Sequence, residues 1–332
     1  MVYLYVAAGL ALLLLGGDFL VRGAVTLARR LGVSPLVIGL TIVAYGTSAP
    51  ELMVSLEAHL SGASGIAIGT VVGSNIANIL LVVGCAALIF PVVSEPGSIR
   101  FNGSILLAAS VVLVVLGLFG AVTPWAAAPM LGVLIVFSWF SYRAERAGAP
   151  GGDPEAALHL KEVEAFEDRP GILVGTLPGS LLVLAAGLVG VVAGSHFLVI
   201  GAVELARGFG LSEATIGLTL VAVGTSLPEL ATAVVAALRR HSDLALGNVL
   251  GSNIFNILGV MGVVPLFGTL AIPADVAAFD LWVMLGVTVF FLIWIVRRGT
   301  IGRVMGAVFL LAYGTYVASR YLGFSALPLP QA

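Results

Sequence analysis

Apolar segments long enough to cross a lipid bilayer recur from one end of this chain to the other. Runs such as ALLLL at 11–15 and VVLVVLGLF at 111–119 are continuous, whereas the strands of a membrane β-barrel alternate apolar and polar residues. Of the 332 residues 60% are hydrophobic and 10% are charged, against about 25% charged in a typical soluble domain. The pattern therefore predicts an all-α membrane protein and excludes a soluble one.

Polar breaks divide the chain into ten predicted transmembrane helices. They lie near 2–21, 33–60, 65–90, 104–120, 125–142, 171–200, 211–238, 244–268, 279–296 and 303–322. The one long hydrophilic stretch separates a first five-helix half, 1–142, from a second, 171–332, and we expect this linker, 143–170, to be cytoplasmic. With both termini placed outside, thirteen of the fifteen lysines and arginines fall at cytoplasmic ends, as the positive-inside rule requires.

A long internal repeat relates the two halves. The segment GLTIVAYGTSAPEL at 39–52 returns as GLTLVAVGTSLPEL at 217–230, and GSNIANIL at 73–80 returns as GSNIFNIL at 251–258. Both pairs are offset by 178 residues, and 35 of 62 positions are identical between about 23–84 and 201–262. Because five helices separate the copies, equivalent helices should cross the membrane in opposite directions. Inverted-topology repeats are typical of secondary transporters that work by alternating access.

The repeat places a glutamate inside the membrane twice, as Glu51 and Glu229. A charged side chain at the centre of a helix costs roughly 2.5–3.5 kcal/mol to insert, so a symmetric pair indicates a function. Pro50 and Pro228 lie one residue before them and interrupt the helical hydrogen bonds of the preceding turn. The carbonyl groups released around Ala44–Thr47 and Ala222–Thr225 could then face an ion.

Further oxygen-bearing residues accompany both glutamates. A spacing of four residues places Thr47 with Glu51, and Ser74 with Asn78, on one helical face, and the second repeat does the same. We expect these two faces to converge. The oxygen donors of both repeats are Thr47, Ser48, Glu51, Ser74 and Asn78 with Thr225, Ser226, Glu229, Ser252 and Asn256. Carboxylate, hydroxyl and amide oxygens suit calcium or sodium, whereas zinc prefers histidine or cysteine.

These motifs, G-T-S-x-P-E and G-S-N-x-x-N, resemble the two α-repeats of the sodium/calcium exchangers in the cation/calcium antiporter superfamily, and the likeness is to their prokaryotic members. The resemblance implies a cell-membrane antiporter that exchanges sodium for calcium, with ions bound near the midplane between helices 2, 3, 7 and 8. It makes Glu51 and Glu229 the central calcium ligands. It implies that sodium and calcium are further held by Thr47, Thr225, Ser48, Ser226, Ser74, Ser252, Asn78 and Asn256 and by the carbonyls of Ala44 and Ala222.

Several alternatives stay open. Some members of the superfamily, including potassium-dependent exchangers, have aspartate where this chain has Asn256, which argues against potassium coupling and removes a possible proton carrier. The exact coupling stays open, and the alternative to sodium/calcium exchange is a calcium or cation antiporter coupled to protons or potassium. A hydrolase with Ser48 or Ser226 as nucleophile lacks a nearby base, since His59 is three turns from Ser48, and a passive channel has no need of the repeat. We therefore expect no enzyme, no cofactor and, at a net charge of −2, no nucleic-acid partner; the oligomeric state is left open.

Overall fold

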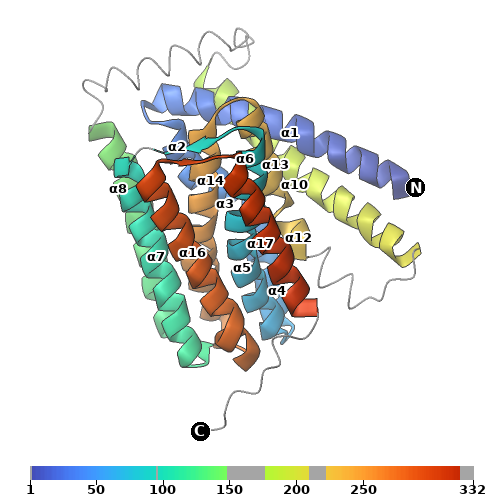
Figure 1. The fold of residues 1–332 in the computed structure, drawn as a ribbon, viewed down its shortest axis with the longest axis vertical. Coiled ribbons are helices and arrows are strands. Elements are labelled where there is room, and N and C mark those ends of the chain that lie inside the picture. The colour runs from blue at the N-terminus through green and yellow to red at the C-terminus, as the bar shows by residue number, and fades with distance from the viewer. Residues whose placement is uncertain (1, 95, 148–175, 209–221, 322–332) are drawn as a thin grey trace. The chain divides into compact units, whose positions relative to one another are not determined.

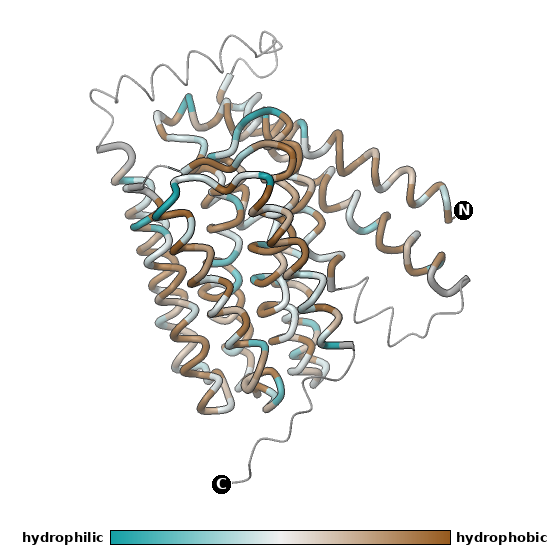
Figure 2. The backbone as a smooth tube through the Cα atoms, in the orientation of Figure 1, coloured by the Kyte–Doolittle hydropathy of each residue, from teal (hydrophilic) through white to brown (hydrophobic). Residues whose placement is uncertain are grey.

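The computed structural model describes residues 2–94, 96–147, 176–208 and 222–321, which are mostly helical (Figure 1). Eight described segments are long and apolar enough to cross a membrane, and Figure 2 shows apolar residues along most of their length. These segments are Val2–Leu31, Pro35–Leu60, Ser64–Ile89, Ile99–Leu118, Pro124–Ala144, Leu177–Leu205, Ser242–Phe267 and Val276–Arg298. The prediction of a multi-spanning helical membrane protein is thus confirmed.

The other two predicted spans, near 211–238 and 303–322, differ from these eight. The first begins outside the described residues and continues as the short apolar helix α13, Leu227–Leu238. The second coincides with α17, Arg303–Tyr321, whose second half YGTYVASRY is less apolar than the eight. Most of the predicted linker 143–170 also lies outside the described residues, from residue 148 onward.

The chain divides into two compact units, and each takes segments from both halves of the sequence. Unit 1 comprises Met1–Thr47 and Ile135–Gly251, and unit 2 comprises Ser48–Leu134 and Ser252–Ala332. The chain passes from one unit to the other after α3, Ala44–Thr47, within α8, Pro124–Ala147, and within α14, Ser242–Ile254. Residues of each repeat are therefore present in both units.

Unit 1 is built on two long helices that lie side by side, α1, Val2–Leu31, and α10, Leu177–Gly208 (Figure 1). Glycines recur along their contact: a Cβ on Gly16 would lie 2.7 Å from the Gly190 carbonyl carbon, and one on Gly187 would lie 2.2 Å from the Leu20 nitrogen. Contacts nearer the ends join Gly9 to Leu198 and Gly23 to Leu184, so the two helices are antiparallel. Small residues allow membrane helices to approach backbone to backbone in this way.

The first helix is longer than predicted, because it continues past 21 to Leu31. Asp18 does not end it, since its carboxylate pairs with Arg22 one turn later at 2.9 Å. Arg239, just after α13, donates a second hydrogen bond to Asp18 at 2.6 Å through Nε. Asp18 is thus held in an ion-pair cluster with Arg22 and Arg239.

Shorter elements complete unit 1. They are α2, Pro35–Ile38, the π-helical segment η1, Gly39–Val43, α3, α12, Ala222–Thr225, α13, and the part of α14 up to Gly251. The short helices α3 and α12 both pack against α10, and α3 also packs against α13. Gly247 and Gly251 of α14 sit against the carbonyl oxygens of Leu36 and Leu40, which leaves no room there for a side chain.

Unit 2 is a bundle of helices joined at its ends by two short strand pairs. Its helical elements are α4, Ala49–Leu60, α5, Ser64–Ala77, η2, Asn78–Val82, α6, Val83–Ile89, α7, Pro96–Leu118, η4, Phe255–Val260, α15, Met261–Val263, η5, Val264–Phe267, η6, Val276–Asp280, α16, Leu281–Arg298, and α17. Strand β1, Val92–Val93, pairs antiparallel with β4, Thr300–Ile301, and β2, Ala121–Val122, pairs antiparallel with β3, Leu270–Ala271.

The same backbone turn ends α4 and α13, which are equivalent helices of the two repeats. Gly62 follows α4 with φ +83°, and Arg240 follows α13 with φ +61°. In each copy the next N–H bonds the carbonyl five residues back, Ala63 to Ala58 and His241 to Ala236. This is a Schellman motif, which normally uses glycine at the left-handed position. Arg240 adopts that conformation without glycine, so the repeat preserves the turn even where the residue has changed.

Candidate cation site

Each repeat contains a helix broken next to its glutamate. In the first repeat α3 ends at Thr47, Ser48 leaves the helical conformation with φ −89° and ψ 7°, and α4 restarts with Pro50 in its first turn. The second repeat does the same at Ser226, with φ −85° and ψ 4°. The prolines cannot donate a backbone hydrogen bond, so the carbonyl four residues earlier loses its usual partner. Both sequence motifs therefore form the break that the prolines predict.

Glu51 lies in unit 2, in the first turn of α4, with no solvent exposure. The Ser74 hydroxyl of α5 donates a hydrogen bond to its Oε1 at 3.3 Å. Ser48 and Ser252 are also buried in this unit. The expected convergence of the Glu51 and Ser74 faces is thus present in the structure. A carboxylate without access to water must be neutralised by a proton or a cation.

Asparagine amides gather in unit 2 where two helices change their winding. The helix carrying Ser74 becomes π-helical at Asn78, and its repeat counterpart does so around Asn256. Asn78 donates a hydrogen bond from Nδ2 to Oδ1 of Asn253 at 3.1 Å. Within the described residues, the amide oxygens of Asn75, Asn78 and Asn256 have no hydrogen-bond donor. π-helical turns are rare and occur frequently at functional sites, and buried carbonyl oxygens without donors are suitable ligands for a cation.

Glu229 lies in unit 1, again in the first turn of its helix and fully buried. Thr225 and Ser226, immediately before it, are buried as well. The Thr47 hydroxyl of α3 lies 3.3 Å from the Ala44 carbonyl oxygen and 3.2 Å from Oδ1 of Asn248. Each unit thus contains one buried carboxylate together with hydroxyl and carbonyl oxygens.

Three of the amides that the structure adds to these groups were not predicted as site residues. Asn75 and Asn253 belong to the repeated G-S-N motif, so the repeat already indicated them. Asn248 gave no such signal, because its counterpart at the 178-residue offset is Thr70. Asn248 is nevertheless fully buried, and its Nδ2 has no acceptor among the described residues. A polar amide inside an apolar helix was the only available sign.

The donor set is made of hard oxygen ligands. Within the described ranges no group of three or more histidine, cysteine, aspartate or glutamate side chains lies together as a transition-metal centre would require. Carboxylate, hydroxyl, amide and backbone oxygens are the ligands of calcium, which takes six to eight of them in flexible geometry. The chemistry of both groups therefore fits calcium or sodium and does not fit zinc or copper.

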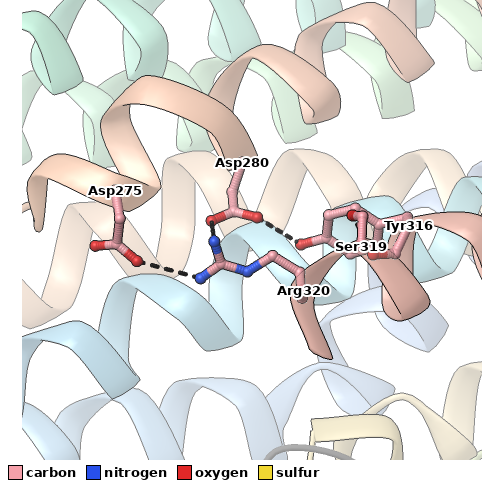
Figure 3. A network of polar contacts seen from close by, with 5 residues as sticks. All are labelled: Asp275, Asp280, Tyr316, Ser319 and Arg320. Carbon is pink, nitrogen blue, oxygen red and sulfur yellow. Dashed lines mark hydrogen bonds and ion pairs between the residues drawn. The ribbon is translucent and has the colours of Figure 1, made fainter. Parts of the chain in front are cut away.

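Unit 2 also contains a second polar cluster, which involves none of the donor-set residues (Figure 3). Tyr316 of α17 donates a hydrogen bond to Oδ1 of Asp280 at 2.9 Å, and Arg320 pairs with Asp280 at 3.4 Å and with Asp275 at 3.2 Å. Asp280 immediately precedes α16 and Arg320 is near the end of α17, so the cluster joins the open end of this helical hairpin. We assign it a structural role.

Comparison with known proteins agrees with this chemistry. The sequence profile of the family described as "Sodium/calcium exchanger protein" matches residues 1–143 and 179–322. The protein CaxA of Alkalimonas amylolytica is 39% identical over 331 residues, covering 97% of this chain and 98% of CaxA. The sodium/calcium exchanger MaX1 of Methanosarcina acetivorans is 34% identical over 339 residues, covering 95% and 97%.

Among solved structures, the sodium-calcium exchanger NCX_Mj soaked with 2.5 mM Na⁺ and 10 mM Sr²⁺ matches with a TM-score of 0.80. It is 33% identical in sequence, and the match covers 96% of this chain and 99% of that one. Fold, motifs and profile thus agree over nearly the whole length. The chain belongs to the sodium/calcium exchanger family, which is a family of membrane antiporters.

Proposed function

We propose that this protein is a secondary active antiporter that exchanges sodium for calcium by alternating access. The observation that carries the proposal is the pair of fully buried glutamates, Glu51 and Glu229, each in a unit that also holds buried hydroxyl and carbonyl oxygens. Two ionised carboxylates carry a charge of about −2, which matches one calcium ion or two sodium ions. Ligands that can hold either cargo in turn are what exchange requires.

Membership of the family supports antiport, and the ligand chemistry supports the two cations. In this proposal Glu51 and Glu229 bind calcium directly. The supporting ligands for sodium and calcium are Thr47, Thr225, Ser48, Ser226, Ser74, Ser252, Asn78 and Asn256, with the carbonyls of Ala44 and Ala222. The buried amide oxygens of Asn78 and Asn256 support their inclusion.

Alternating access by an inverted repeat is supported by the strand pairs of unit 2. Strands β1 and β3 are equivalent in the repeat, since Val92 and Leu270 are 178 residues apart. β3 precedes α16, whereas β1 pairs with β4, which follows α16. Equivalent points of the two copies therefore lie at opposite ends of one membrane helix, as an inverted repeat requires. We place the protein in a prokaryotic cell membrane with both termini outside and the linker in the cytoplasm.

Radioactive calcium uptake into proteoliposomes tests the proposal. Vesicles loaded with sodium and diluted into sodium-free buffer should accumulate calcium in a saturable manner, and a sodium ionophore should abolish the uptake. Parallel vesicles carry a potassium gradient or a pH gradient in place of sodium. Uptake driven by a pH or potassium gradient but not by a sodium gradient would show that protons or potassium, and not sodium, are the coupling ion. Uptake that rises linearly with calcium concentration, without saturation, would overturn the antiporter mechanism itself.

A further inference from the structure

One hydroxyl outside the donor set contacts the broken helix of the second repeat. Ser195 of α10 donates a hydrogen bond to the carbonyl oxygen of Gly224 in α12, at 2.6 Å, and its side chain is buried. Gly224 is four residues before Pro228, so its carbonyl is the one that loses its helical partner at the break. Both residues lie within unit 1. The Ser195 hydroxyl supplies the hydrogen bond that the proline nitrogen cannot.

A second contact one turn along α10 fixes the same short helix. A Cβ built on Gly224 would lie 2.4 Å from Cγ2 of Val199, so the side chain of Val199 rests against this glycine. Ser195 and Val199 are four residues apart and share one face of α10. A helix of four residues does not hold its own shape, because the first turn costs more conformational entropy than its hydrogen bonds return. The orientation of Ala222–Thr225 is thus set by α10.

The first repeat has no equivalent of this hydroxyl. The position 178 residues before Ser195 is Gly17, which has no side chain, and the position equivalent to Gly224 is Gly46. A Cβ on Gly17 would lie 2.9 Å from Cγ2 of Val235 in α13, so the backbone there is packed against a different helix. Position 17 of the first repeat therefore cannot donate the capping hydrogen bond that Ser195 donates in the second, although the two motifs around it are nearly identical.

We propose that Ser195 is a positioning residue for sodium binding, an inference that rests on the proposed function. It fixes the turn whose neutral oxygens, the Ala222 carbonyl and Thr225, are ligands in that proposal. Calcium is attracted mainly by the charge of the two carboxylates, whereas a monovalent ion gains half of that attraction and depends more on well-placed neutral oxygens. Loosening the turn should therefore weaken the binding of sodium more than the binding of calcium.

Calcium uptake at varied sodium and calcium concentrations tests this in proteoliposomes. Ser195→Ala should raise the half-saturating sodium concentration about fivefold, the equivalent of one hydrogen bond worth about 1 kcal/mol, and change that of calcium less than twofold. Ser195→Thr keeps the hydroxyl and should restore the wild-type value. The matched control is Ser180→Ala, because Ser180 is a buried serine of the same helix that bonds its own helix at the Leu177 carbonyl.

The possible results separate this inference from the function itself. An unchanged sodium dependence in Ser195→Ala, or an equal rise for both ions, would leave Ser195 as a packing residue and overturn the inference, while the wild type still exchanges the two ions. A wild type without sodium coupling would overturn the proposed function and this inference with it. If Ser195→Ala does not accumulate as a monodisperse protein, Ser195→Cys provides a weaker donor, and its expected shift has the same direction.

Discussion

Each of the two units contains one buried glutamate, yet the interiors of the two units are packed in different ways. In unit 1 the long helices α1 and α10 meet through glycines at backbone distance, and the short broken helices rest on α10. In unit 2 large side chains such as Phe291 and Phe309 fill the core, and strand pairs join the helix ends. A glycine contact between two helices has few interlocking side chains, whereas a core of aromatic rings and paired strands has many. Sequence identity in the motifs therefore does not produce identical surroundings.

The largest effect is expected from the glutamates, and it tests whether both units contribute equally. Glu51→Gln and Glu229→Gln each remove one of two charges while keeping the side-chain shape, so each should reduce calcium transport at least about 100-fold. Sodium-driven calcium uptake measures this, with size-exclusion chromatography to show that each variant remains folded. Near-normal transport in either variant would show that the carboxylate of that unit does not bind calcium.

The second-largest effect is expected at the glycine contact of unit 1, where a substitution should lower the stability of the fold. Gly187→Ala would place a Cβ 2.2 Å from the backbone nitrogen of Leu20, and backbone atoms cannot move aside as a flexible side chain can. We expect a loss of about 3 kcal/mol, seen as a clear fall in the unfolding temperature in detergent. Gly314→Ala in α17 is the control, because no described atom lies within 4 Å of its Cβ position and alanine favours a helix by up to about 1 kcal/mol. Equal unfolding temperatures for the two variants would refute close backbone packing between α1 and α10.

Much of this arrangement was accessible from the sequence, because hydropathy and repetition are local signals. The apolar runs predicted the membrane helices, and the 178-residue repeat selected Glu51 and Glu229 from the seventeen acidic residues of the chain. The four-residue spacings predicted that the faces of Glu51 and Ser74 converge, and their hydrogen bond confirms it. The prolines predicted both helix breaks.

What the sequence could not predict depends on tertiary contacts. The π-helical turns at Asn78 and Asn256 are only five and six residues long, which is too short for a change of side-chain periodicity to show in the sequence. Asn248 and Ser195 escape notice because their repeat counterparts are Thr70 and Gly17. Asp18 pairs with Arg239, which is 221 residues away in the sequence, so this contact is seen only in the folded chain. The repeat thus identifies what the two copies share, and the structure is needed for what they do not share.

The smallest predicted effect is a difference in stability loss when one arginine is removed from the ion-pair cluster of each unit. In unit 2 the Asp280 side chain is only 6% exposed, and Arg320, at 25%, is its basic partner in the described cluster (Figure 3). Arg320→Ala would leave a buried carboxylate with the Tyr316 hydroxyl alone, so we expect a loss of about 2 kcal/mol. In unit 1 Asp18 is 27% exposed and also pairs with Arg22, so Arg239→Ala should cost no more than about 1 kcal/mol.

Thermal unfolding in detergent at low and high salt separates these two expectations. The unfolding temperatures of the wild type and Arg239→Ala should converge as the salt concentration rises, because salt screens a partly exposed ion pair. The difference in unfolding temperature between the wild type and Arg320→Ala should persist. Asp280→Asn combined with Arg320→Ala removes the buried charge together with its partner, and it should recover part of the lost stability. If the double variant were less stable than Arg320→Ala, the carboxylate of Asp280 would have a stabilising partner other than Arg320 and Tyr316, and the hairpin of α16 and α17 would not depend on this ion pair.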